Sequence, residues 1–205
     1  MKKLFLASSF AEVASMFKNF ANEDLKGKTV TFIPTASLPE TVIFYVEAGK
    51  KALEELGLIV DELEISKATA GEISGKLQKN DYIYVTGGNT FYLLQELKRT
   101  GTDKMITEQI NAGKLYIGES AGSMVVSPNI EYAKRMDDHK KAPELKSFDA
   151  LNVVDFYPLP HHTNFPFKKT VEKIIAQYQP ELKLYPISNS QAILVNETDV
   201  KVKNE

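Results

Sequence analysis

The chain has 205 residues, with 25 basic and 27 acidic side chains and a net charge of −2. It therefore lacks the basic excess that predicts binding to nucleic acid or to an anionic membrane surface. Hydrophobic residues make up 43% of the chain and cysteine is absent, which predicts a packed core without disulfides, thiolate metal sites or a cysteine nucleophile. This length suits one domain over residues 1–205, and the composition fits a cytoplasmic protein.

Two lysines at the N-terminus precede a short apolar stretch, residues 4–7. The apolar core of a signal peptide needs about 7–15 residues, so this segment predicts a buried strand instead. We also find no uncharged apolar run of about 18 residues, so no membrane-spanning helix is expected.

Strand-like and helix-like segments alternate along the chain. The β-branched and aromatic runs predict strands, followed by shorter ones in the tail that fit a hairpin or edge strands: residues 3–7, 29–33, 58–63, 81–86, 115–117 and 152–160, then 182–187, 191–195 and 198–202. Apolar residues at helical spacing predict helices between them: residues 10–20, a stretch from Pro39 to Gly57 with Val42, Val46, Leu53 and Leu56 on its core face, then 73–78, 91–99, 103–111, a helix through Val126, and 167–178.

Successive strand–helix units predict a mainly parallel sheet covered on both faces, which is a three-layer α/β sandwich. Ligand sites in such sheets lie at the carboxyl ends of the strands. Residues 86–90 and 118–122 are both strand-to-helix turns, so we expect them at the same edge. Residues 127–150 interrupt the alternation, and their charge and weak periodicity favour an active-site loop or flap.

The segment Leu-Tyr-Ile-Gly-Glu-Ser-Ala-Gly-Ser at residues 115–123 contains the pattern G-x-S-x-G. In this pattern a strained strand-to-helix turn lifts a serine above the strand end, where helix N–H groups can stabilise an oxyanion. We therefore predict Ser120 as a nucleophile. The alternative is a Gly/Ser-rich helix start without chemistry, because short matches to this pattern arise by chance.

A serine nucleophile needs a neighbouring base, and the chain has three histidines: His139, His161 and His162. His161 and His162 follow a predicted strand and are therefore better placed than His139, which lies in the charged segment. An acceptor must orient the base. The carboxylates downstream of the serine are the candidates, and the sequence does not choose among them: Asp137, Asp138, Glu131 and Asp155.

The backbone N–H groups of Ala121 and Gly88 are the expected oxyanion donors, since Gly88 lies in the neighbouring strand-end turn. Asn89, Thr90, Glu119 and His162 flank these positions and are predicted to contact substrate. A tight turn with a helix cap is the alternative interpretation of residues 87–90. Their spacing matches neither G-x-G-x-x-G nor a P-loop with its lysine, so no nucleotide site is expected. A serine nucleophile of this kind is also expected to need no cofactor and no metal.

Several motifs together resemble the peptidase E, or aspartyl dipeptidase, family of serine peptidases: GGNTFYLL at 87–94, LYIGESAGS at 115–123, FDAL at 148–151, PHHTN at 160–164 and SNSQAIL at 188–194. The resemblance implies a fold similar to class I glutamine amidotransferases, which is flavodoxin-like, with a serine in place of their cysteine. It implies Ser120 as nucleophile, His161 as base, and Gly88 and Ala121 as oxyanion donors. The implied substrates are dipeptides with N-terminal aspartate.

The chain departs from this family after residue 164. Aspartyl dipeptidases carry a longer stretch there with a substrate-binding arginine, whereas this chain has only Lys168 and Lys169. A lysine lacks the bidentate fork that an arginine offers a carboxylate. The sequence therefore supports three hypotheses about function. The protein is a peptidase for small peptides, another acyl hydrolase or cyanophycinase-like enzyme, or a non-catalytic protein that binds a small ligand.

Overall fold

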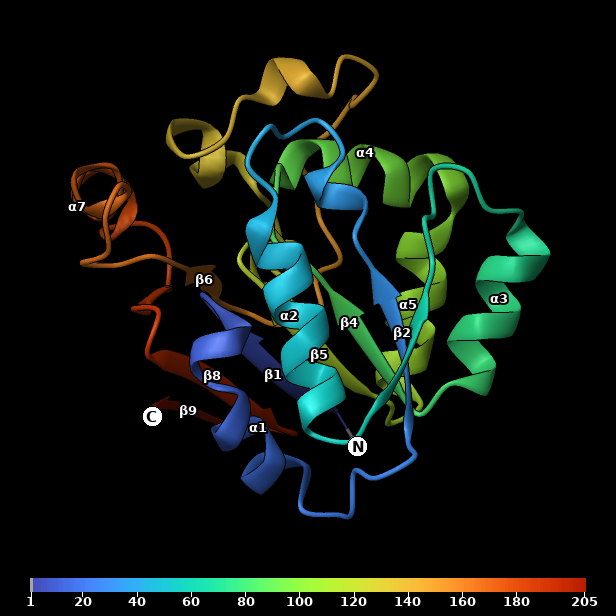
Figure 1. Ribbon diagram of the computed structural model, residues 1–205. Helices are drawn as coiled ribbons and strands as arrows, with labels where there is room; N and C mark the ends of the chain where they lie inside the picture. The colour runs from blue at the N-terminus through green and yellow to red at the C-terminus, as the bar shows by residue number, and fades with distance from the viewer. Residues whose placement is uncertain (1) are drawn as a thin grey trace.

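The computed structural model describes residues 2–205, which form a seven-stranded sheet between two layers of helices (Figure 1). The strand order is β3-β2-β4-β5-β1-β8-β9. The first five strands of that order run parallel, and β8 and β9 form an antiparallel hairpin at one edge. The three-layer α/β fold expected from the sequence is confirmed. The strands are β1 Lys3–Ala7, β2 Thr29–Ile33, β3 Ile59–Glu62, β4 Tyr82–Val85, β5 Leu115–Glu119, β8 Gln191–Asn196 and β9 Asp199–Asn204.

Alternate residues of the central strands enter two separate apolar cores. Leu4 and Leu6 of β1 pack with the helices of one face, whereas Phe5 and Ala7 pack with those of the other. This alternation follows from the strand repeat of two residues, and burial on both faces explains why these strands are almost wholly apolar. The helices are α1 Ala14–Ala21 and α2 Phe44–Glu55 on one face, and α3 Ala70–Lys79, α4 Thr90–Thr100, α5 Thr102–Asn111, α6 Ala121–Met124 and α7 Lys168–Tyr178 on the other.

The register of the parallel strands brings three chain turns together at the carboxyl edge of the sheet. Ala7 of β1 is paired with Glu119 of β5, and Val85 of β4 is paired with Gly118 of β5. The residues that follow these strand ends therefore lie side by side. This arrangement places the turn after β4 and the turn after β5 at the same edge, as the alternation predicts.

Two predicted elements differ in the structure. The strand expected at 152–160 is reduced to β6, Tyr157–Leu159, which pairs with β7, Leu184–Pro186, outside the main sheet. Val153, Val154 and Phe156 before it remain buried, but the N–H groups of Asn152 and Val153 donate to the carbonyls of residues 127 and 126, just after α6, and so form no strand ladder. Val42, expected on the core face of a helix, is 59% exposed because α2 begins only at Phe44.

Residues 127–150 form a folded segment above the carboxyl end of the sheet (Figure 1). It contains two short 3₁₀ helices, η3 Glu131–Arg135 and η4 His139–Lys141. At the start of α4, the Asn89 side chain donates to the Asp138 carbonyl, and the N–H and hydroxyl of Thr90 donate to Asp137, so the segment is anchored to that helix. Across residues 2–205, every helix is too short or too polar to cross a membrane.

Candidate active site

Ser120 occupies a strained turn between β5 and α6. Its backbone φ of 48° and ψ of −105° lie in a region that non-glycine residues rarely adopt. Glycines on either side make the turn possible. A Cβ on Gly118 would lie 2.5 Å from the Gly122 carbonyl oxygen, and a Cβ on Gly122 would lie 2.2 Å from the Val85 carbonyl oxygen. The turn therefore has the close backbone approach that the G-x-S-x-G pattern predicts.

His161 lies beside Ser120, although 41 positions separate them in the chain. The Ser120 Oγ and His161 Nε2 are 2.9 Å apart, a hydrogen-bonding distance. The imidazole stands in the loop after β6, and the Phe167 ring stacks on it with a centroid distance of 4.8 Å. Burial lowers the pKa of His161, which favours the neutral imidazole that can accept a proton.

The other nitrogen of His161 faces two neutral side chains. Its Nδ1 lies 3.0 Å from the Asn189 Oδ1 and 3.0 Å from the Ser8 Oγ. Asn189 follows β7, and Ser8 follows the end of β1 at the same edge of the sheet. The sequence predicts a carboxylate here, and the structure places an amide and a hydroxyl there instead.

The four carboxylates predicted to orient the histidine bind other groups. Asp137 accepts hydrogen bonds from the Thr90 N–H and hydroxyl, at 2.9 and 2.5 Å, and Asp138 accepts one from the Lys140 N–H. Glu131 pairs with Lys134 at 2.7 Å, and Asp155 pairs with Lys183 at 3.3 Å. The expectation that Asp137 or Asp138 orients His161 therefore does not hold in this geometry.

The turn after β4 borders the nucleophile turn. A Cβ on Gly87 would lie 3.2 Å from the Ser120 Cβ, so the two turns are in contact. Ala121 is the first residue of α6, and the first N–H groups of a helix have no partner within it. Gly88 and Ala121, whose amides are predicted as oxyanion donors, thus belong to two turns that are in contact.

The chain resembles known peptidases over nearly its whole length. The model of peptidase family S51 matches residues 4–203. The chain belongs to peptidase family S51. It is therefore a serine peptidase, and the resemblance to peptidase E is confirmed.

This S51 peptidase has relatives among known sequences and among solved structures. An uncharacterized peptidase of Listeria innocua is 61% identical over 203 residues, or 99% of this chain and 97% of that one. A peptidase E of Nostoc sp. is 32% identical over 80% of this chain and 66% of its own. The crystal structure of a Listeria monocytogenes protein provisionally named peptidase E gives a TM-score of 0.96 at 60% identity, covering 100% of this chain and 99% of that one.

Three of the four predicted substrate contacts of this S51 peptidase have structural partners instead. Asn89 caps α4 by accepting from the Tyr92 N–H at 3.0 Å, and it donates to the Asp138 carbonyl. Thr90 is fully buried and donates to Asp137. Both side chains therefore bind residues of the 127–150 loop. Their position beside a glycine turn predicts contact with substrate, whereas the structure gives them partners in this loop.

Glu119, the last residue of β5, is also buried, with 2% of its surface exposed. Its carboxylate accepts from the Phe10 N–H and the Tyr84 hydroxyl, both at 2.9 Å, and burial raises its pKa. The residue therefore ties β5 to the residues after β1, and its burial leaves it almost no surface for contact with a substrate. His162, the fourth candidate, is partly exposed, and its N–H donates to the Ile187 carbonyl at 2.9 Å.

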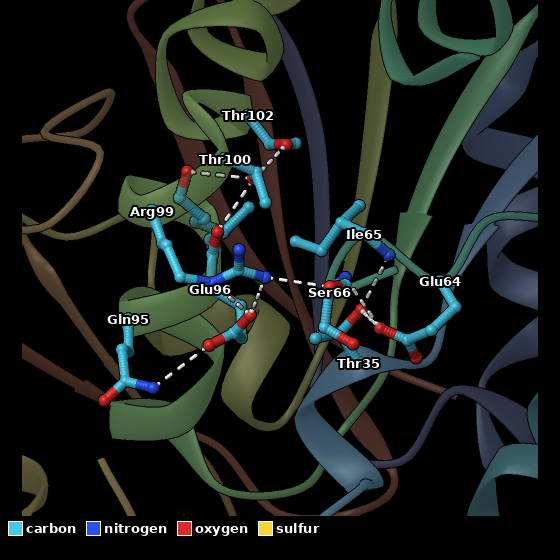
Figure 2. A network of polar contacts seen from close by, with 10 residues as sticks. Thr35, Glu64, Ile65, Ser66, Gln95, Glu96, Arg99, Thr100 and Thr102 are labelled. Atoms are coloured by element: carbon cyan, nitrogen blue, oxygen red, sulfur yellow. Dashed lines mark hydrogen bonds and ion pairs between the residues drawn. The ribbon is translucent and has the colours of Figure 1, made fainter. Parts of the chain in front are cut away.

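Both arginines of the chain are engaged in internal contacts. Arg99 at the end of α4 binds the Glu96 carboxylate at 2.6 Å and the Ser66 carbonyl at 2.8 Å (Figure 2). Arg135 donates to the Gln177 side chain on α7. Figure 2 shows that the Arg99 guanidinium joins α4 to Ser66 in the segment after β3, where Glu64 in turn accepts from the Thr35 hydroxyl and the Ser66 N–H. Both guanidinium groups therefore connect elements of the fold to one another.

Asp137 couples the stability of the loop over α4 to pH. Burial raises its pKa to about 6, and the nearby Glu40 carboxylate adds to this. The folded state therefore binds this proton more tightly than the unfolded chain, whose carboxyl titrates near 4. The free energy of unfolding should fall as pH rises from about 4 to about 6, and the contribution should stay lost at higher pH.

The variant Asp137→Asn cannot titrate and should escape this loss. We expect it to equal the wild type near pH 4 and to exceed it by about 1–2 kcal/mol above pH 7, after allowing for partial solvent access. Urea unfolding of both proteins at pH 4.5, 6 and 7.5 measures the difference. Stability curves that run parallel over this range would contradict the assignment.

Proposed function

We propose that this S51 peptidase hydrolyses short peptides through an acyl-enzyme formed on Ser120. The observation that carries the proposal is the 2.9 Å distance between the Ser120 Oγ and the His161 Nε2, at the start of a helix. A serine hydroxyl becomes an effective nucleophile when a base at this distance accepts its proton.

In the first half of the reaction, the Ser120 Oγ attacks the carbonyl carbon of the scissile bond and its proton passes to the His161 Nε2. The carbonyl oxygen becomes an oxyanion, which the N–H groups of Gly88 and Ala121 stabilise. The intermediate then expels the amine, which takes the proton from His161. Ser120 is left as an ester of the N-terminal part of the substrate.

In the second half, a water molecule attacks the ester carbonyl and gives its proton to the His161 Nε2. Collapse of this intermediate breaks the bond to the Ser120 Oγ, which recovers the proton from His161. The acid product leaves and the free enzyme is restored. One imidazole therefore acts as base and then as acid in each half of the reaction.

We propose dipeptides with an N-terminal aspartate as the preferred substrates. Lys168 and Lys169 are exposed at the start of α7, directly after the Phe167 ring that stacks on His161. Two ammonium groups and the positive end of this helix attract an acidic side chain near the nucleophile. They replace the arginine of aspartyl dipeptidases with point charges, which predicts a weaker preference for aspartate.

A matched pair of dipeptides tests this proposal. We expect the wild type to cleave Asp-Leu with a kcat/KM about 10-fold or more above that for Asn-Leu, because only the carboxylate gains from the lysines. The double variant Lys168→Ala/Lys169→Ala should lose this ratio but retain hydrolysis of Asn-Leu. Lys173→Ala removes an exposed lysine later in α7 and should leave the ratio unchanged.

The outcomes separate the specificity from the activity. Equal rates on both dipeptides would end the aspartate assignment but leave the peptidase. A protein that cleaves esters but no member of a dipeptide panel, isoaspartyl peptides included, would be another acyl hydrolase. Thermal stabilisation by dipeptides without any turnover would indicate a binding protein.

A further inference from the structure

A chain of polar contacts continues from Ser120 beyond His161 to a carboxylate near the N-terminus. The His161 Nδ1 lies 3.0 Å from the Asn189 Oδ1, and the Asn189 Nδ2 donates to the Glu12 Oε1 at 3.1 Å. Glu12 ends the short 3₁₀ helix η1, Phe10–Glu12, and is exposed. The amide of Asn189 thus stands between the imidazole and the negative charge.

The contacts of Asn189 fix which way its amide faces. A carboxylate can only accept, so the Asn189 group toward Glu12 is the NH₂ and the Oδ1 faces His161. The Asn189 N–H in turn donates to the Asn164 Oδ1 at 2.9 Å, which holds the loop in place. The orientation of this side chain follows from the partners that surround it.

The contacts of Ser8 determine which ring nitrogen of His161 carries the proton. Its hydroxyl donates to the Asn189 Oδ1 at 2.8 Å, and its oxygen accepts from the His161 N–H at 2.8 Å. Because the Ser8 proton is committed to Asn189, the Ser8 oxygen can only accept from the His161 Nδ1. Both neighbours of Nδ1 are therefore acceptors. The Nδ1 carries the proton, which leaves the Nε2 free to accept the proton of Ser120.

The charged groups around His161 differ in whether hydrogen bonds connect them to the imidazole. The charged and titratable groups on the elements around His161 include Glu12, Glu119 and His162, together with Lys168, Lys169, Glu172 and Lys173 of α7. Glu119 is turned toward Phe10 and Tyr84, and Lys168 is exposed to solvent. Glu12 is the carboxylate connected to the imidazole through hydrogen bonds.

We propose that Asn189 is the positioning residue for His161, and that Glu12, acting through the Asn189 amide, supplies the negative charge that stabilises the imidazolium. The inference rests on the proposed function, since the imidazolium that matters for catalysis is the one formed when His161 takes the Ser120 proton. In the usual serine triad a carboxylate contacts the imidazole directly and performs both tasks. Here one side chain orients the ring and another carries the charge.

A charge transposition tests this division of roles. The double variant Asn189→Asp/Glu12→Gln moves the carboxylate one residue closer to His161 and keeps the net charge and the hydrogen bond between the two positions. A carboxylate in direct contact raises the pKa of an imidazole, so the acid limb of the kcat/KM profile should move up by about 1–2 pH units. Activity at pH 8–9 should be retained.

Two single variants isolate the parts. Asn189→Ala should lower kcat about 10²–10⁴-fold with little change in KM, since the ring is no longer held. Glu12→Gln, at an exposed position, should fold normally, lower kcat several-fold and move the acid limb to lower pH. Glu54→Gln changes an exposed glutamate on α2 and should match the wild type. Unfolding temperatures identify any variant that fails to fold.

Nitrogen-15 NMR of the imidazole distinguishes this inference from the proposed function. In the resting wild type we expect the Nδ1–H tautomer of His161, and in the double variant a raised His161 pKa. These signals do not depend on hydrolysis, so a protein that shows them but cleaves no peptide would refute the function and leave the positioning role. An Nε2–H tautomer, or an unmoved pKa and acid limb in the double variant, would overturn the inference.

Discussion

Ser120→Ala is expected to lower kcat/KM for a cleaved dipeptide about 10³-fold or more. The variant keeps the turn but removes the Oγ that lies 2.9 Å from the His161 Nε2, so no acyl-enzyme can form. Covalent labelling by a fluorophosphonate should disappear in parallel, because the phosphorus reacts with the same oxygen. Steady-state kinetics and mass spectrometry of the labelled protein measure the two effects.

A second serine in the same turn provides the control. Ser123 is fully buried, and its hydroxyl donates to the carbonyls of Ala7 and Gly118 at 2.7 and 2.8 Å. Ser123→Ala should therefore cost about 1 kcal/mol of unfolding free energy and leave Ser120 reactive in the folded protein. Turnover that persists in Ser120→Ala, or a label mapped to another serine, would remove Ser120 as the nucleophile.

Gly88→Ala is expected to lower the free energy of unfolding by about 3 kcal/mol or more. The backbone φ of Gly88 is 135°, and a Cβ there would lie 2.2 Å from the Ala36 carbonyl oxygen and 2.6 Å from the Ser37 nitrogen. The backbone must shift to relieve this contact, and the shift displaces an expected oxyanion donor. We therefore also expect slower labelling of Ser120 in the fraction that remains folded.

Glycines in α3 supply the comparison for this substitution. Gly75 lies inside the helix, and a Cβ there would meet no atom within 4 Å. Gly75→Ala should raise the free energy of unfolding by about 0.5–1 kcal/mol, since alanine is the better helix former. Denaturant unfolding of both variants gives the values. A Gly88→Ala protein as stable as the wild type would show that the turn is free to move.

Much of the site could be predicted because local sequence determines it. The apolar strand runs and the glycines around Ser120 specify a strand, a sharp turn and a helix within a few residues. Parallel strands also have their carboxyl ends at one edge, which predicts the turn of Gly88 beside the serine. The loop of His161 was expected there for the same reason, although β6, which precedes it, lies outside the main sheet. These predictions use chain direction and backbone geometry alone.

The partner of the His161 Nδ1 could not be predicted in this way. Asn189 and Ser8 lie 28 and 153 positions from His161, and neither is a carboxylate, which is the group that orients the histidine of a usual serine triad. No sequence motif marks Ser8, which follows β1, so its contact with His161 could not be predicted. Asn189 lies in a motif shared with the family, SNSQAIL, and that was the one signal that pointed to it.

By itself, the sequence determined the order and type of most elements, the three-layer fold, the nucleophile turn and the family. Only the tertiary structure decided that Asp137 anchors the loop to α4, that Glu119 is buried against Tyr84, and that Asn189 faces His161. The physical reason is that a turn depends on a few adjacent residues, whereas a hydrogen-bond partner depends on which distant segments the packed core brings within about 3 Å.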